Sequence, residues 1–372
     1  MTGYQLPDGR DFEQVFESGN SNITTNYITS NQSDLGSLFR AGNSGIVTGY
    51  EILYNGVYTD LGSLFEAKLP FVAYGTYIAG TTDKDPITGY RYYYAIFTQP
   101  ANPNGDSAQD SLNSGSIQFN QDGTSLTMIG IGGGGKGGNA SSGESAGGGG
   151  GGAVYMKTQS YNILTNYTRN TVLVSVGWAG GQYDNYGGGE TGFYYNLYSN
   201  TIFRCFGGQN GTNTGAGAGG EWIYIDANGN YITGGTGGTG GDQDNGDNCD
   251  YYDGGPSLGI PSVLIAAQPY YISNYYSGGG GGSKSNNEDN SYYGGQGAGQ
   301  PISSSPTNFL TGIGGLRSGA TDSSGVSMYP GQTGQGWGGG GGSGGFQKSG
   351  SNYYSGGNGK QGLAIAYAPI KT

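Results

Sequence analysis

The sequence predicts a mainly β protein, with a glycine-rich β domain of packed, extended polyglycine segments preceded by short strand, turn and helix repeats. Gly accounts for 83 of 372 residues, about three times ordinary usage. Strand-like runs alternate with glycine runs over most of the chain, and a short unit repeats at the N-terminus. The expected organisation is a repeat arm at 1–68, a β-rich connecting segment at 69–115 and the glycine-rich β domain at 116–372.

The repeat arm begins each unit with Thr-x-Tyr, followed by a polar turn, Asp and a Leu/Phe pair; the units start at Thr2, Thr25 and Thr48, 23 residues apart. Asp favours the start of a helix, and apolar residues spaced i, i+3, i+4 after it are typical of one helical turn. Each unit therefore predicts an extended piece and a turn of helix. Because so short a unit cannot bury its apolar face alone, the copies either stack together or dock on a larger assembly. The Asp residues are Asp11, Asp34 and Asp60, and the expected docking residues are Phe12, Phe16, Leu35, Phe39, Leu61 and Phe65.

Runs that favour strands follow the repeat arm. Residues Leu363, Ile365 and Tyr367 alternate with alanines, the period of a strand, and the pair Asn228-Gly229 predicts a hairpin turn. The runs are YRYYYAIFTQ at 90–99, SIQFNQDG at 116–123, SLTMIGI at 125–131, AVYMKT at 153–158, TVLVSVGWA at 171–179, TIFRCFG at 201–207, EWIYID at 221–226, NYIT at 230–233, SVLIAA at 262–267 and LAIAYAPI at 363–370.

Uninterrupted glycine runs lie between these strands, at 132–135, 147–152, 278–282 and 338–342. Free glycine loops lose more backbone entropy on ordering than any other residue and offer no side chain in return. Extended chains with three residues per turn must find hydrogen bonds outside themselves, and neighbouring glycine runs supply them. The runs are therefore predicted to pack on one another, with flexible linkers as the alternative.

The stretch GIGGGGKGG at 130–138 matches the glycine patterns of dinucleotide-binding and phosphate-binding loops. A phosphate-binding loop needs Ser or Thr directly after Lys136 and a helix after that, but Gly137 follows and the next residues are too glycine-rich for a helix. No nucleotide site is predicted. Lys136 is expected to be a solvated charge on a glycine turn.

The residue types for catalysis are scarce, and the protein is not expected to be an enzyme. It has no His and two Cys, Cys205 and Cys249, which excludes a four-ligand zinc site built from Cys and His; unpaired thiols are favoured over one bridge. The acidic stretch 242–253 lacks the residue order of a calcium loop. No catalytic residue, metal or cofactor is therefore predicted.

The charge and hydropathy of the chain indicate which kinds of partner it is expected to bind. The net charge of −12 disfavours binding to nucleic acid or anionic membranes. No stretch approaches the ~20 apolar residues of a membrane span, and the first residues lack the pattern of a signal peptide. Synthesis in a cytosol, without membrane insertion, is expected.

Tyr is abundant, at 33 residues, and occurs in pairs among Gly, Asn and Ser. Antibody loops combine rigid amphipathic rings with adaptable polar neighbours in the same way, so these pairs suit contact with sugars or protein surfaces. Rings that cover glycine backbone are the alternative. The candidate contact residues are Tyr194, Tyr195, Tyr251, Tyr252, Tyr275, Tyr276, Tyr292 and Tyr293.

From about Ser116 to Thr372, the segments MIGIGGGGKGG, GGGGGGAVYMKT, VLVSVGWAGG, CFGGQNG and GGGGGSGGF resemble the glycine-rich domain of virion and tail proteins of phages and large DNA viruses. The N-terminal repeat is similar to units in structural proteins of giant viruses. The chain also resembles the tail-tip adhesins of T-even-type phages, in which loops between glycine runs contact the host, although the repeat has no counterpart there.

These resemblances imply a structural virion protein, associated with a capsid, fibre or tail, that mediates assembly and surface contact. The alternative is a receptor- or glycan-binding adhesin at a fibre tip, acting through the Tyr-rich loops. Implied partners are further copies, other virion proteins, and a host surface glycan or protein. The implied location is the virion surface, with an extracellular filament as the alternative.

Overall fold

A computed structural model of the chain divides into two compact units, Met1–Leu69 with Ile370–Thr372, and Pro70–Pro369. It describes residues 39–41, 50–54, 57–60, 69–99, 114–119, 125–139, 146–160, 171–181, 187–195, 201–212, 215–226, 229–236, 240, 258–272, 331, 333–334, 336–343 and 355–370. Within these residues, no helix has the length and apolar character needed to cross a membrane.

The smaller unit contains a three-stranded antiparallel sheet of β1 (Phe39–Ala41), β2 (Tyr50–Tyr54) and β3 (Val57–Asp60), in that order. Phe39 was expected in a helical turn, but it begins β1 and pairs with Ile52; strand pairing overrides the local helical spacing here. The other expected docking residues, Phe12, Phe16, Leu35, Leu61 and Phe65, lie outside the described residues.

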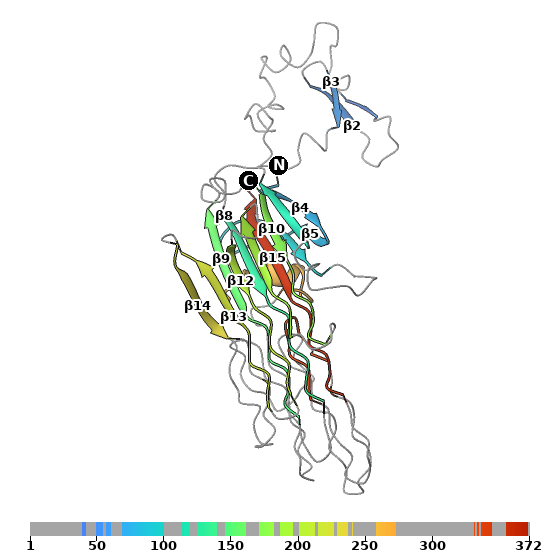
Figure 1. The fold of residues 1–372 in the computed structure, drawn as a ribbon. Helices are drawn as coiled ribbons and strands as arrows, with labels where there is room; N and C mark the ends of the chain where they lie inside the picture. The colour runs from blue at the N-terminus through green and yellow to red at the C-terminus, as the bar shows by residue number, and fades with distance from the viewer. Residues whose placement is uncertain are drawn as a thin grey trace, which may run out of the picture. The chain divides into compact units, whose positions relative to one another are not determined.

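The larger unit contains two sheets (Figure 1). The seven-stranded sheet has the order β14 (Tyr231–Thr236), β13 (Glu221–Ile225), β12 (Thr201–Cys205), β11 (Thr191–Tyr195), β10 (Thr171–Ser175), β7 (Gly115–Phe119) and β4 (Phe71–Gly75). The five-stranded sheet has the order β5 (Tyr77–Thr81), β6 (Arg91–Phe97), β15 (Leu363–Ile370), β8 (Ser125–Ile131) and β9 (Val154–Ser160). The mainly β prediction is confirmed.

The two sheets pack face to face as a sandwich. Ring contacts join them: the centroids of Phe71 and Tyr93 lie 4.8 Å apart, and those of Tyr155 and Phe203 lie 5.2 Å apart. Strands β4, β5 and β6 and the first residue of β7 belong to these same sheets, so the described residues of the segment expected at 69–115 lie in the sandwich. The core residues with less than 2% exposure include Phe71, Phe97, Ile117, Met128, Phe193 and Phe203.

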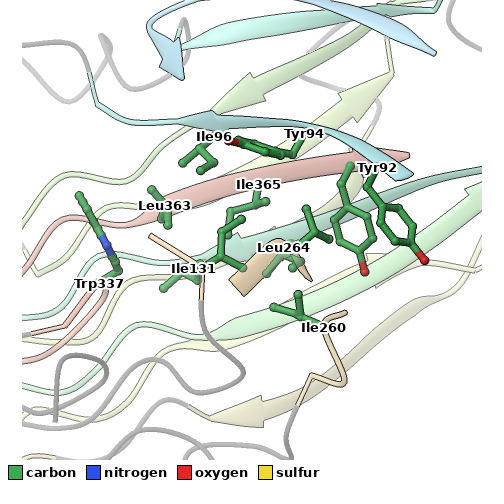
Figure 2. Packing of buried hydrophobic residues seen from close by; sticks show 12 residues of the cluster. Tyr92, Tyr94, Ile96, Ile131, Ile260, Leu264, Trp337, Leu363 and Ile365 are labelled. Atoms are coloured by element: carbon green, nitrogen blue, oxygen red, sulfur yellow. The ribbon is translucent and has the colours of Figure 1, made fainter. Parts of the chain in front are cut away.

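A second core covers the other face of the five-stranded sheet. Along β15, Leu363, Ile365 and Tyr367 point to this face while the alternating alanines face the sandwich. Helix α5 (Ser262–Ala267) lies over the face and buries Leu264 there (Figure 2). The cluster consists of Tyr92, Tyr94, Ile96, Ile129, Ile131, Ile260, Leu264, Ile272, Trp337, Leu363, Ile365 and Tyr367.

The run SVLIAA at 262–267 was predicted as a strand, and this prediction is wrong: it forms α5. A short apolar run suits a buried strand or a buried helical turn equally well, since its periodicity does not separate the two. Pro261 directly before the run favours the helix, because proline is well tolerated where a helix starts.

Candidate interaction surface: the glycine lattice

The glycine-rich segments leave the strands at one end of the sandwich and run side by side (Figure 1). We call them the glycine lattice; it comprises residues 132–138, 147–153, 176–181, 187–190, 206–212 and 215–220, the described residues of 331–343, and 355–362. Gly132, Gly135 and Gly138 donate their N–H groups to the carbonyls of Ala153, Gly150 and Gly147, each at 2.8 Å. This three-residue repeat is that of a polyproline-II-type chain, which has no internal hydrogen bonds.

Segment 132–138 is bonded to six other segments and is therefore the centre of the lattice. It donates to 147–153 as above, to 187–190 through Gly133, and to 355–362 through Gly134 and Gly137. Its carbonyls accept from Gly180, Gly208, Gly211 and Gly341 of the remaining three segments. Such a network holds each segment in several directions at once.

Close packing explains why these positions are glycine. A side-chain carbon added at Gly135 would overlap the backbone carbonyl of Gln209, and one added at Gly150 would overlap that of Ala218. The prediction that the runs at 132–135, 147–152 and 338–342 are packed backbone is thus confirmed. The run at 278–282 lies outside the described residues.

Polar side chains satisfy backbone groups where the lattice meets the strands. The buried Thr191 hydroxyl accepts from Gly177 N–H at 2.9 Å and donates to the Ile131 carbonyl at 2.7 Å. The Ser114 hydroxyl accepts from Val176 N–H at 3.0 Å. Neither residue was predicted from the sequence, although each is a hydroxyl residue next to a glycine where a strand begins.

Amide side chains do the same within the lattice. Asn210 Oδ1 accepts from the Lys136 N–H at 2.8 Å, and Asn139 Oδ1 accepts from the Gly356 N–H at 3.0 Å. Both asparagines stand beside glycines in the sequence. At these two points the amide oxygen accepts a hydrogen bond as backbone carbonyls do elsewhere in the lattice.

The lattice is fixed to the sandwich by Trp337, at a turn where Gly339 N–H bonds to the Gly336 carbonyl and Gly338 has a φ of 72°. The Trp337 ring stacks on Tyr271, with centroids 5.4 Å apart, and its indole N–H donates to the Tyr270 carbonyl at 3.0 Å. Trp337 lies at one end of the cluster in Figure 2. The second core therefore holds the base of the lattice.

A polar network lies beside the lattice base on β11 and β12. The Tyr194 hydroxyl donates to Glu190 Oε1 at 2.9 Å and accepts from the Ser175 hydroxyl at 3.3 Å, while Glu190 Oε2 lies 3.4 Å from Arg204. Burial and the nearby Glu190 charge raise the pKa of Tyr194. Glu190 and Ser175 thus give the buried Tyr194 hydroxyl its hydrogen-bond partners.

Tyr194 was proposed as a surface contact, and the structure corrects this. The residue is only 1% exposed, because its ring is buried against the sheet and its hydroxyl is used internally. Tyr195 is half-buried, and its hydroxyl donates to Gln159 Oε1 of the other sheet at 2.9 Å. The remaining candidates, Tyr251, Tyr252, Tyr275, Tyr276, Tyr292 and Tyr293, lie outside the described residues.

Lys136 is part of an extended lattice segment, not of a glycine turn as the sequence suggested. Its N–H bonds to Asn210 and its carbonyl accepts from Gly211, and no helix follows in the described residues up to Asn139. The pattern GIGGGGKGG therefore arises from strand β8 continuing into the lattice, with glycine required for packing.

The lattice surface carries no exposed charge in its described residues. The exposed positions are Gln209, Thr212, Ala216, Ala218, Thr333, Ser355 and Asn358, and Asn139, directly after segment 132–138, is also exposed. Its charged residues, Lys136, Glu190 and Lys360, are half-buried, and Lys360 lies over the Trp337 ring at 5.5 Å from the centroid. This surface offers amide, hydroxyl and methyl groups to a partner.

In the described part of the molecule, no three His, Cys, Asp or Glu side chains gather as a metal site would require. Cys205 is a buried free thiol that donates to the Gly130 carbonyl at 3.2 Å. Burial raises its pKa well above the ordinary value, which disfavours the thiolate that a nucleophile needs.

The two ends of the larger unit lie on the same side of the sandwich. Strand β4 begins at Phe71, which pairs with Phe119, and ends at Gly75, which pairs with Gly115. Gly115 also pairs with Val174, close to where β10 continues into the lattice, so β4 ends near the lattice. Strand β15 follows lattice residue Gly362 directly and runs away from it. Pro70 and Pro369, the two ends of this unit, therefore both lie at the end of the sandwich opposite the lattice.

At the far end of the lattice, the residues that flank three chain connections are hydrogen-bonded to one another or to a shared neighbour. The N–H groups of Gly138, Gly147 and Gly357 donate to the carbonyls of Gly147, Thr212 and Gly342, respectively. The connections 140–145, 213–214 and 344–354 thus start from neighbouring points. No protein-family model matches the chain, and no curated protein matches its sequence.

Proposed function

We propose that this protein is a structural component of a virion surface, held at one end and presenting the glycine lattice at the other. One observation carries the proposal. Pro70 and Pro369 lie together at one end of the unit, and the far end of the lattice lies at the other. An element held at one end and displaying loops at the other suits contact beyond the particle. The resemblance of the glycine segments to virion and tail proteins supports the particle as the place.

The lattice serves this function through its stiffness. Each segment is hydrogen-bonded to several neighbours, and glycine alone allows backbones to approach this closely. The connections at its far end are therefore carried away from the sandwich on a support that resists bending. Attachment at one end and support of the connections at the other do not require catalysis, and we propose no enzymatic activity.

Immunoelectron microscopy of particles purified from the source culture tests the proposal. Antibodies raised against the full chain are expected to label the particle surface. Serum first adsorbed with the purified protein is the control and removes the label. Purified particles that carry none of the protein would overturn the proposal.

A second candidate function is adhesion to a host glycan or protein. The observation that favours it is the uncharged lattice surface together with three connections starting from one end. One of these connections, 344–354, contains the pair Tyr353-Tyr354, a composition suited to sugar or protein contact. The adhesive function would then reside in the connections, with the lattice as their support.

Replacing Tyr353 and Tyr354 by Ser in the virus separates the two functions. The adhesin predicts particles that assemble normally but attach poorly to host cells. Replacing the exposed Tyr231, on the sandwich, by Ser is the matched control and should not affect attachment. Normal attachment of the double variant would exclude this pair as the contact.

A further inference from the structure

Two Asn-Gly pairs, Asn210-Gly211 and Asn358-Gly359, lie within the glycine lattice. Asn is among the thermolabile residues, because the backbone nitrogen of the next residue can attack its side-chain amide carbon. Glycine in that next position makes the attack easiest, since it has no Cβ and restricts the backbone least. Such a pair is therefore a site of spontaneous deamidation wherever its backbone is able to turn.

Deamidation of an Asn-Gly pair takes two steps. First, the glycine nitrogen forms a bond with Asn Cγ, the bond from Cγ to the amide nitrogen breaks, and ammonia leaves with the proton that the glycine nitrogen gives up. Water then opens the resulting succinimide ring at either of its two carbonyls. One product is Asp, and the other is isoaspartate, in which the main chain passes through the side-chain carbons and is one atom longer. The first step requires the glycine nitrogen to turn toward its own Asn side chain.

Hydrogen bonds to Lys136 hold both reacting groups of the first pair. Asn210 Oδ1 accepts from the Lys136 N–H, and the Gly211 N–H donates to the Lys136 carbonyl, each at 2.8 Å. A side-chain carbon added at Gly211 would overlap the Gly147 carbonyl, so the backbone is also packed here. For the Gly211 nitrogen to reach Asn210 Cγ, both groups must leave Lys136.

The second pair is held through the peptide group that joins its two residues. The Asn358 carbonyl accepts from the Gly334 N–H at 2.9 Å, and the Gly359 N–H donates to the Gly180 carbonyl at 3.0 Å. Gly359 is buried, and a carbon added there would overlap the Gly134 carbonyl. The Asn358 side chain is exposed, so it is the backbone of this pair that the lattice restrains.

The hairpin between β13 and β14 provides an Asn-Gly pair outside the lattice, Asn228-Gly229. Gly229 is exposed, and a carbon added there would meet no atom within 4 Å. Its N–H bonds within the turn, to the Asp226 carbonyl at 3.1 Å. Turning Gly229 therefore disturbs a bond within the turn, whereas turning Gly211 or Gly359 displaces neighbouring segments of the lattice.

We propose that the glycine lattice protects Asn210 and Asn358 from deamidation, and that both become deamidation sites when the lattice opens. Local opening of a folded protein costs a free energy between almost nothing and that of global unfolding, and well-packed elements lie toward the upper limit. Isoaspartate at either position would add one atom to a segment whose hydrogen bonds recur every three residues, which would shift its register with its neighbours. The inference rests on these contacts and not on the proposed function.

Peptide mapping of the purified full chain by mass spectrometry tests this inference. The protein is aged at mildly alkaline pH, in native buffer and in denaturant, and the conversion of Asn210, Asn358 and Asn228 to Asp and isoaspartate is followed. Conversion at Asn210 and Asn358 is expected to be about tenfold or more slower in native buffer than in denaturant. Conversion at Asn228, the internal control, is expected to differ by less than about threefold.

Gly149→Ala links the protection to the lattice, because its methyl group displaces the backbone of Gly135 in the central segment. This variant is expected to speed native deamidation of the two lattice pairs and not of the hairpin pair. Gly215→Ala, at an open position, is the matched control and should change none of the three rates.

Equal rates in native buffer and in denaturant at either lattice pair would overturn the inference. Equal protection of the hairpin pair would also overturn it, because that protection does not come from the lattice. A folded but less stable Gly149→Ala protein that deamidates at wild-type rates would count against the lattice in the same way. The wild-type comparison decides the inference even where Gly149→Ala does not fold.

Discussion

The backbone carbonyl of Gly135 occupies the place beside Gly149 where a side chain would begin. The Gly149 N–H is also bonded to the Gly341 carbonyl at 2.9 Å, so the residue is held between two other segments. A methyl group at 149 requires the lattice backbone to move, because the overlapping atom is not a flexible side chain. We predict that Gly149→Ala lowers the free energy of unfolding by about 1–3 kcal/mol, measured by chemical denaturation of the full chain.

Gly215→Ala is the matched control for this prediction. An added carbon at Gly215 meets only the Thr212 hydroxyl oxygen, at 3.8 Å, and its φ is not in the left-handed region. Substitution there should leave stability unchanged or raise it by about 0.4–1 kcal/mol, since Ala restricts the unfolded chain. Equal effects of the two substitutions would mean that lattice packing does not select glycine.

Thr191 joins a lattice segment to the end of strand β8 through one hydroxyl, which bonds both Gly177 N–H and the Ile131 carbonyl. Thr191→Val keeps the shape but leaves both buried groups without this partner. A buried unpaired group costs about 1–3 kcal/mol, so we predict a loss of about 2 kcal/mol or more in the free energy of unfolding. The exposed Thr233 of β14 offers the control, Thr233→Val, which should change stability little. A Thr191→Val protein as stable as the wild type would contradict the assigned role.

Much of this architecture follows from the sequence because its cause is local. Glycine runs between strand-like runs predict packed backbone, since only contact with other backbone makes so much glycine useful. The pair Asn228-Gly229 predicts the hairpin between β13 and β14, and Gly229 has the positive φ, 83°, that such a turn requires. These features need no knowledge of distant residues.

The features that the sequence does not reveal depend on distant partners. Glycine runs resemble one another, so nothing local indicates that 132–138 is the central segment. Tyr194 has the same neighbours in sequence as a surface tyrosine, but Ser175 and Glu190 meet its hydroxyl only after the strands pair. Strand β11 itself follows a glycine run without the long apolar stretch that marks β8 or β15.

Buried tyrosines make the protein sensitive to alkaline pH. Burial, reinforced by neighbouring Tyr224, raises the pKa of Tyr155 to about 12, and burial raises that of Tyr367 to about 12. The ordinary value is about 10. Because the folded-state pKa is the higher one, the stabilisation is complete below pH 10 and is lost as the pH rises from 10 to 12. We predict that stability falls across this range.

Ultraviolet titration of tyrosinate checks this prediction. The folded protein should show a first group of tyrosines titrating near pH 10 and a second group appearing only near pH 12 as the fold opens, whereas the denatured chain should titrate in one step. Tyr155→Phe should reduce the second group. A single step near pH 10 for the folded protein would contradict the burial of Tyr155 and Tyr367.

The Cys205 thiol reports on the opening of the sandwich where it meets the lattice. Its sulfur is fully buried and donates to the Gly130 carbonyl on the opposite sheet, and its raised pKa keeps it in the unreactive protonated form. In a Cys249→Ser background, we predict that an aromatic disulfide reagent does not react in native buffer and reacts fully in denaturant. Gly149→Ala should speed the native reaction if lattice and sandwich open together. Rapid labelling of the native Cys249→Ser protein would show that this part of the core opens without global unfolding, contrary to the packing described.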